Sequence, residues 1–425
     1  MTPMIRLPIE IIAEIIAAVV DGTEFTSEDP DFYPGRDEHH PLAAASLVSR
    51  TWSTICRPHI FRIISISTRT MDDRLWFLHF EAPHLSEFIH VVHLQCDYDP
   101  DTTLAWYPEC LGRLKNLRVL HLDSWMSTLL LEPGPLSAGI SSMLAAPCLR
   151  KLALRGCDLS EDASDLRAML PVTLKELVLE GISATSDIEG KTTSTPRLEA
   201  LRSLKLQEIY HPMFRLKNFI ECPNLDRLSA HWYSGQPWDL PPWVPSSLSE
   251  LVLCGMSLSS SVSDCNIPDF GTAIQPSVVE INQSGDTSYL ELFMWIKDCI
   301  RNLPFPTSIR TLTLDIENIK LDCDDHPEDI SPSLSEYGML SHFLLQLYEE
   351  GGLKGIILNI TASVGSSDPK SLCVDEAQEL AKLKIGFAPL LKENILDVDF
   401  IMSSWAEGGT TWHSSIQRVK HASHS

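Results

Sequence analysis

Residues 114–122 read L-K-N-L-R-V-L-H-L, and the phrase L-x-x-L-x-L within them returns along the chain. Good copies of the phrase begin at Leu117, Leu149, Leu174, Leu201, Leu225, Leu248 and Ile309. Successive starts from 117 to 248 differ by 32, 25, 27, 24 and 23 residues. The second and third leucines of each copy are two residues apart, so both point to one face of a short strand. Stacked strands of this kind would bury their leucines in one continuous core.

This phrase and its period resemble the leucine-rich repeat. Weaker copies begin at Ile89, Pro276, Leu353 and Ile395. Helical segments are expected between copies at 136–146, 162–170, 289–303, 336–350 and 375–391. The predicted fold is α/β, an irregular leucine-rich-repeat solenoid over 66–402 with a parallel sheet on its concave face and helices behind. Starts at 309, 353 and 395 differ by 44 and 42 residues, so the last repeats are expected to be irregular.

Composition limits the classes of partner. The 425 residues carry a net charge of -24, which disfavours nucleic acid and anionic membranes because their phosphates would be repelled. The 11 cysteines include no C-x-x-C pair, so reduced thiols in a cytoplasmic or nuclear protein are expected. No apolar run reaches the length that spans a bilayer.

The N-terminal stretch 6–20, R-L-P-I-E-I-I-A-E-I-I-A-A-V-V, is apolar enough to raise the question of a signal peptide. Glu10 and Glu14 interrupt it, which argues against that interpretation. Its apolar residues recur at i, i+1, i+4 and i+5, so it predicts an amphipathic helix that ends at Asp21-Gly22. Two further short helices are predicted at 42–48 and 51–56, the second stopped before Pro58.

These N-terminal pieces resemble an F-box. The resemblance rests on L-P-x-E-I-I at 7–12, S-L-V-S-R-T-W at 46–52 and P-H-I-F-R at 58–62. It implies a three-helix domain over 1–65, with an acidic insertion at 23–40 that departs from the short connection common in the family. It also implies docking on a Skp-family adaptor, and through it on cullin and RING subunits. The residues implied for adaptor binding are Leu7, Pro8, Ile11, Ile15, Leu47, Val48 and Trp52. The alternative is a plain helical cap in which some of these residues only hold the helices together.

The function implied by the resemblance is the substrate-recognition subunit of an SCF-type (Skp–cullin–F-box) ubiquitin ligase, which is not itself catalytic. The alternative is a leucine-rich-repeat scaffold acting outside a cullin ligase. The sequence contains no phosphate-binding G-x-x-x-x-G-K-[ST], no G-x-S-x-G and no H-E-x-x-H. His90 and His93 would fall on opposite faces of a strand, which favours packing over metal binding. No cofactor or metal is expected.

An unidentified protein substrate is expected to bind the concave face, where residues alternating with the leucines point. The candidates there are His121, Asp123, Lys151, Arg155, Glu176, Lys205 and Arg227. A Pro- and Gly-containing stretch, 231–243, adds Trp232, Trp238 and Trp243; these rings either form an interface hot spot or cover an edge of the repeats. The acidic run 315–329 is expected to be a solvated loop, and the tail 403–425 is expected to be disordered.

Overall fold

The computed structural model describes the chain in fifteen stretches. They are residues 8–21, 42–67, 70–95, 105–123, 134–156, 170–182, 197–207, 220–232, 248–256, 274–284, 289–303, 306–322, 334–366, 376–406 and 413–419. Unit 1 is Met1–Leu201 with Asn218–Glu221, and unit 2 is Arg202–Lys217 with Cys222–Ser425. The N-terminal helices and the first repeats are both in unit 1, and the boundary expected at residue 65 stays a prediction.

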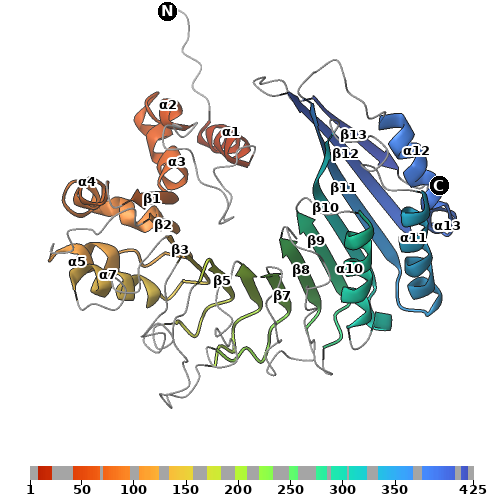
Figure 1. Ribbon diagram of the computed structural model, residues 1–425. Coiled ribbons are helices and arrows are strands. Elements are labelled where there is room, and N and C mark those ends of the chain that lie inside the picture. The colour runs from red at the N-terminus through yellow and green to blue at the C-terminus, as the bar shows by residue number, and fades with distance from the viewer. Residues whose placement is uncertain are drawn as a thin grey trace, which may run out of the picture. The chain divides into compact units, whose positions relative to one another are not determined.

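Unit 1 carries a parallel sheet in chain order, preceded by helices (Figure 1). Its strands are β1 (Ile63–Ser67), β2 (Val91–Gln95), β3 (Val119–Asp123), β4 (Lys151–Arg155) and β5 (Glu176–Glu180). Its α-helices are α1 (Ile9–Asp21), α2 (Leu42–Ser46), α3 (Arg50–Ile60), α4 (Met71–Trp76), α5 (Tyr107–Gly112) and α7 (Pro135–Leu144). A π-helix, η2 (Phe77–Glu81), and a 3-10 helix, η3 (Pro83–Phe88), follow α4. Strand β1 was not predicted, since it carries no leucine phrase.

Unit 2 continues the same pattern with longer strands (Figure 1). Its strands are β6 (Ser203–Gln207), β7 (Arg227–Trp232), β8 (Glu250–Met256), β9 (Val278–Ser284), β10 (Thr311–Asp322), β11 (Gly355–Ser366), β12 (Leu396–Ala406) and β13 (His413–Val419). Its helices are α10 (Tyr289–Arg301), η6 (Pro306–Ser308), α11 (Leu334–Glu349), α12 (Glu376–Gly386) and α13 (Ala388–Lys392). Strands β6 to β12 pair in parallel, and only β13 is antiparallel to its neighbour β12. Long helices α10 and α11 lie on one side of this sheet (Figure 1).

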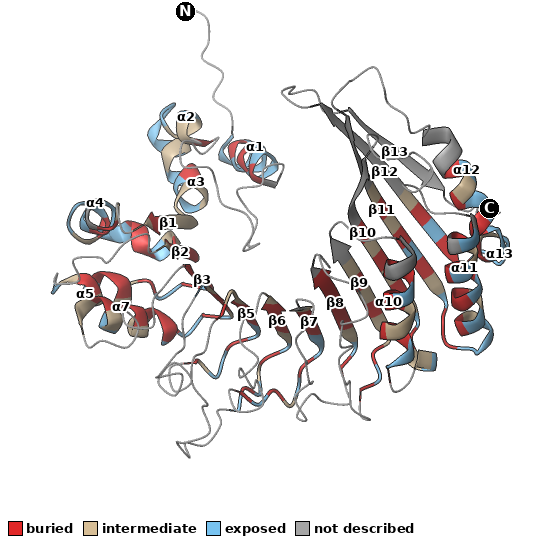
Figure 2. Ribbon diagram, viewed as in Figure 1, coloured by how far each residue is buried: buried red, intermediate tan, exposed pale blue. Residues whose placement is uncertain are grey.

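The leucine phrase does what its spacing predicts. A tight turn precedes each strand: the N–H groups of Leu117, Leu149 and Leu174 each donate to the carbonyl three residues earlier, at 3.1 Å. The following leucines then stack across the sheet, with Leu152 in register with Leu120 on one side and Leu177 on the other, all buried (Figure 2). The prediction of a leucine-rich-repeat-like parallel sheet is confirmed by this register.

The N-terminal helices differ from expectation at Pro58. Helix α1 ends at Asp21 as predicted, and α2 spans only Leu42–Ser46. Helix α3 does not stop before Pro58 but runs through it to Ile60, with the Phe61 N–H bonded to the Arg57 carbonyl. A proline inside a helix removes one hydrogen bond. Ile55 and Ile60 of the same helix pack against the buried cluster, which favours continuation of the helix through the proline.

Three predictions near the C-terminus were wrong. The acidic run begins inside β10, which extends to Asp322, so its first half is strand and not loop. The segment expected to be a disordered tail contains the end of β12 and all of β13. Both result from backbone pairing, which demands no particular side chain. The helix expected at 375–391 is broken into α12 and α13 around Phe387, two residues before Pro389. Of the helix expected at 162–170, residues 162–169 lie outside the described residues.

Candidate functional site

Helix α1 has two apolar faces, and only one is used inside unit 1. Ile12, Ile16 and Val20 are buried in a cluster completed by Leu42 and Cys56. Each of the three lies four residues from the next, so they form one stripe of the helix. This stripe holds α1 against α2 and α3.

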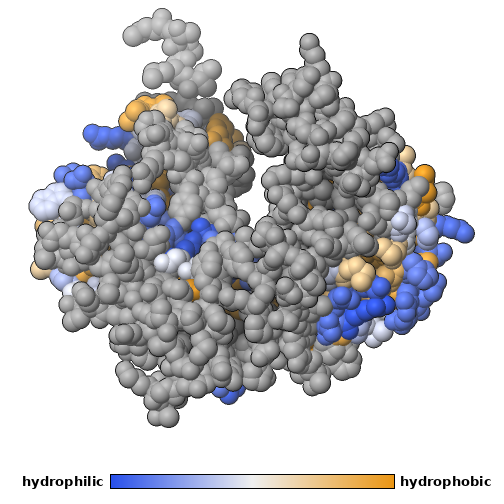
Figure 3. Space-filling view, in the orientation of Figure 1, coloured by the Kyte–Doolittle hydropathy of each residue, from blue (hydrophilic) through white to orange (hydrophobic). Residues whose placement is uncertain are grey.

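The second stripe faces outward. Ile11, Ile15 and Val19 follow the same four-residue spacing one position earlier, and all three are exposed. Leu47 and Val48, in the turn between α2 and α3, are 85% and 67% exposed. We call these five residues the N-terminal apolar surface; hydrophobic atoms over α1 and α2 are visible in Figure 3. Val19 was not among the residues predicted for adaptor binding, although its four-residue spacing from Ile15 indicates that both lie on the same face of α1.

The other residues predicted for adaptor binding are placed differently. Pro8 is exposed and its carbonyl accepts the Ile12 N–H at 3.2 Å, so it sits at the start of α1. Trp52 is partly buried against the core cluster, so it helps hold the helices together. The Ser49 hydroxyl caps α3 by accepting the Trp52 N–H at 3.3 Å. Leu7 lies outside the described residues.

On the sheet face opposite the leucines, the predicted charged residues pair with one another. Lys151 Nζ lies 3.4 Å from Glu176 Oε2 across β4 and β5, and Arg155 Nε lies 2.8 Å from Glu180 Oε2 four residues further along the same two strands. In unit 2, Arg227 Nε lies 3.2 Å from Glu250 Oε1 across β7 and β8. These side chains neutralise their neighbours, which weakens each as a binder of a charged substrate. The sequence could not show this, because the pairs depend on strand register.

His121 and Asp123 are not open to a substrate. They are 1% and 7% exposed, which corrects the expectation that they lie on a bare face. The His121 ring stacks on His93 of β2, with ring centres 4.3 Å apart and planes 17° from parallel. Contact between His93 and His121 was not predicted, because the sequence suggested only His90 as a neighbour of His93, three residues away on the other face.

Burial sets the protonation of this pair. Desolvation, helped by the nearby cation Arg155, lowers the pKa of His93 to about 4. Desolvation, helped by His93 and by the cations Lys151 and Arg155, lowers the pKa of His121 to about 2. Burial raises the pKa of Asp123 to about 6, against the opposing effect of Arg155. The imidazoles are therefore neutral at pH 7, and their near-parallel rings do not converge on a common point where a metal could bind.

Unit 1 also carries an aromatic cluster that was not predicted from the sequence. Trp76, Phe77 and Phe80 are exposed at the junction of α4 and η2. The Trp76 and Phe80 ring centres are 4.1 Å apart, and Trp106 lies 6.2 Å from Trp76. The spacing of Trp76 and Phe80, four residues, was the available signal.

The remaining residues predicted for substrate binding lie on β6, on β7 or outside the described residues. Lys205 is half-buried on β6, and Trp232 belongs to β7. Trp238 and Trp243 lie outside the described residues. In the described stretches, no three His, Cys, Asp or Glu side chains gather as a metal site requires. None of the helices there combines the length and the apolar character that crossing a membrane requires.

Comparison with known proteins adds little. No family model matches the chain, and no curated protein matches it. Among solved structures, the chain is similar to an internalin from Listeria monocytogenes, at 12% sequence identity and a TM-score of 0.27. That match covers 97% of this chain and 100% of the internalin chain. Similarity this low supports no argument on fold or function, so the repeat architecture rests on the strand register described above.

Proposed function

We propose that the chain is the substrate-recognition subunit of an SCF-type ubiquitin ligase, a cytoplasmic or nuclear protein that is not itself catalytic. In this proposal the N-terminal apolar surface binds a Skp-family adaptor, which brings the cullin and RING subunits. The repeats bind a protein substrate. The observation that carries the proposal is the outward stripe Ile11, Ile15 and Val19.

The two apolar stripes of α1 have different surroundings, one in the core and one at the surface. The inward stripe already supplies the core cluster, so the outward stripe is not needed to hold α1 in place. Full burial of an exposed Val or Ile side chain is worth roughly 1.5–3 kcal/mol, so each of these partly exposed side chains would gain a fraction of that when a partner covers it. Contiguous apolar surface of this kind is typical of protein–protein interaction sites. The stripe coincides with Ile11 and Ile15, the residues implied by the F-box resemblance.

The first test measures adaptor affinity. Purified full-length chain is titrated with a recombinant Skp-family adaptor by calorimetry, alongside the variants Ile11→Asp and Ile15→Asp. Each variant is expected to weaken binding by about tenfold or more, because a carboxylate would be desolvated in the interface. The control is Ile385→Asp, an isoleucine on α12 that is more exposed than Ile11 and Ile15. Wild-type protein that binds no adaptor, or Ile385→Asp weakening binding as much as Ile15→Asp, refutes the proposal.

The second candidate function is a repeat scaffold outside a cullin ligase. The two functions separate when adaptor, cullin and RING subunits are mixed with the chain and resolved by size exclusion. A complex containing cullin supports the ligase subunit, and adaptor binding that excludes cullin supports the scaffold.

A further inference from the structure

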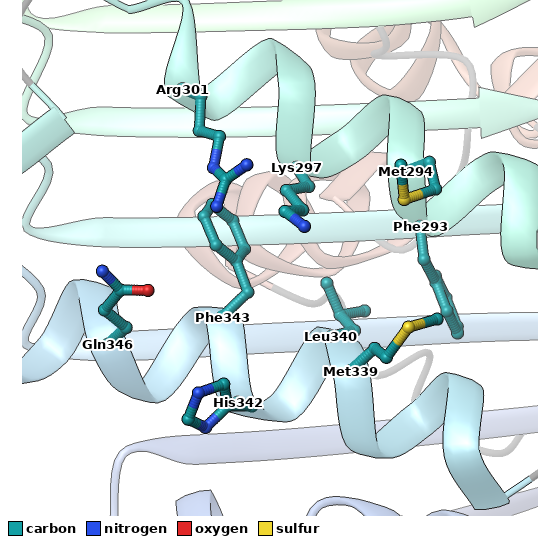
Figure 4. Close-up of a pocket in the computed structure, with 9 residues that line it drawn as sticks. All are labelled: Phe293, Met294, Lys297, Arg301, Met339, Leu340, His342, Phe343 and Gln346. Carbon is teal, nitrogen blue, oxygen red and sulfur yellow. The ribbon is translucent and has the colours of Figure 1, made fainter.

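A groove between α10 and α11 of unit 2 is part of no site described above. Figure 4 shows its walls, with Phe293, Met294, Lys297 and Arg301 from α10 facing Leu340 and Phe343 from α11. Phe293, Leu340 and Phe343 are buried and form its floor. The cavity has a volume of about 160 Å³. Ligand pockets for drug-sized molecules are commonly about 300–1,000 Å³, so this groove has room for one or two side chains and not for such a ligand.

The rim of the groove is apolar at one end. Met294 on α10 and Met339 on α11 are 43% and 48% exposed, and they flank the floor from opposite helices (Figure 4). Methionine is flexible and polarizable, so paired methionines adapt to differently shaped apolar side chains and recur at peptide-binding surfaces. This end therefore suits one apolar side chain of a partner.

The rest of the rim carries two cations, Lys297 and Arg301, with His342 beside them. Lys297, Arg301 and His342 all line the groove, although the whole chain carries a net charge of -24. Within the described stretches, neither Lys297 nor Arg301 forms a salt bridge. The Arg301 guanidinium carbon lies 5.5 Å from the centre of the Phe343 ring. Stacking on an aromatic face holds a guanidinium still while leaving its N–H edge available to a carboxylate.

The Glu350 carboxylate bonds to the groove-lining Gln346 and pairs with neither Lys297 nor Arg301. Gln346 Nε2 donates to Glu350 Oε1 at 2.9 Å, and Glu350 lies just after α11. Among the described residues, the two cations of the rim therefore have no carboxylate paired with them.

From this geometry we propose that the groove binds a short acidic segment of a partner protein, one carrying an apolar side chain beside a carboxylate. The apolar side chain enters between Met294 and Met339, and the carboxylate bonds to Arg301 and Lys297. The proposal does not depend on adaptor binding, because the groove is built from α10 and α11 alone.

The test uses a library of random short peptides displayed on phage, panned against the full-length protein. Peptides recovered are expected to be enriched in Asp or Glu next to Leu, Met or Phe. Binding of the best synthetic peptide, followed by fluorescence anisotropy, is expected to weaken about tenfold or more in Lys297→Glu/Arg301→Glu. Arg301→Lys is expected to reduce peptide affinity less, because lysine keeps the positive charge but loses the planar guanidinium that stacks on Phe343. Met294→Asp should also weaken binding.

The matched control is Lys384→Glu, an exposed lysine on α12 away from the groove. It should leave peptide affinity unchanged, and circular dichroism melts show whether each variant is folded. Adaptor affinity, measured separately, should be the same in the groove variants as in wild type, so failure of one proposal is distinguishable from failure of the other. The inference is overturned if no peptide is recovered or if the recovered peptides show no acidic bias. It is also overturned if they bind the folded double variant as tightly as wild type.

Discussion

At the scale of single residues, the stacked pair His93 and His121 is the feature with the clearest consequence. Both imidazoles are buried on strands β2 and β3, and neither ring nitrogen of His121 finds a hydrogen-bond partner among the residues that the structure describes. A buried polar group without a partner costs about 1–3 kcal/mol. A charged imidazole in the same place would cost more, which is why burial holds both pKa values below the ordinary 6.5.

The stability of the protein is therefore expected to fall on acidification. Between about pH 4 and 6.5 both imidazoles become protonated in the unfolded chain but stay neutral in the folded chain. The free energy of unfolding therefore falls as pH falls. Asp123 acts in the opposite direction between 3.8 and about 6, because the folded carboxyl holds its proton there. Two imidazoles outweigh one carboxyl, so the net change is a loss.

Urea unfolding at pH 5 and pH 7 measures this loss. In the double variant His93→Leu/His121→Leu the acid-induced drop should shrink, by up to about 1.4 kcal/mol per pH unit for each proton no longer taken up. His84→Gln, a change at an exposed histidine, is the control and should leave the drop as it is. An unchanged drop in the double variant would contradict the assignment to this pair.

At the scale of elements, two glycines in the helices of unit 2 differ in how closely a neighbouring helix packs against them. Gly338 lies inside α11 with open space around it, so a Cβ there would meet nothing within 4 Å. Gly386, at the end of α12, is different: a Cβ there would contact the side chain of Tyr337, which is buried. The close approach of α11 and α12 therefore depends on Gly386 and not on Gly338.

The two alanine variants are expected to move stability in opposite directions. Gly338→Ala should stabilise the protein by roughly 0.5–1 kcal/mol, because alanine loses less backbone entropy in a helix. Gly386→Ala should destabilise it by about 1–3 kcal/mol, because the packed Tyr337 must shift. Chemical denaturation of both variants measures the change, each serving as the control for the other. Stabilisation by Gly386→Ala would show that the helices approach less closely than described.

At the scale of the whole molecule, charge is the dominant property. The net charge of -24 produces self-repulsion, and the cross-strand ion pairs relieve it only locally. Partly exposed pairs such as Arg227–Glu250 are worth about 0–1 kcal/mol each, and salt screens them as well.

Raising the ionic strength is therefore expected to raise the melting temperature. Between very low salt and about 0.15 M the Debye length falls to about 8 Å, which screens the long-range repulsion more than the short ion pairs. Differential scanning fluorimetry across a sodium chloride series measures the effect, and a potassium chloride series controls for a specific ion. A melting temperature that falls with both salts would mean that ion pairs outweigh repulsion.

The residue pattern alone was sufficient for the strands and for the outward stripe of α1. The leucine phrase located β3 to β8 because burial of residues two apart is a local property of a strand. Ile11 and Ile15 were predicted for docking, and both are exposed. The same local logic missed β1 and β13, which pair through backbone groups and carry no leucine phrase.

Tertiary structure alone decided which side chains meet. His93 lies beside His121, Lys151 beside Glu176, and Met294 across a groove from Met339, although each pair is separated by 25 to 45 residues along the chain. These contacts depend on parallel register and helix packing, and both depend on loops whose lengths vary from repeat to repeat. A pattern read along the chain shows which face a residue occupies, but its neighbour across the sheet is set by the fold as a whole.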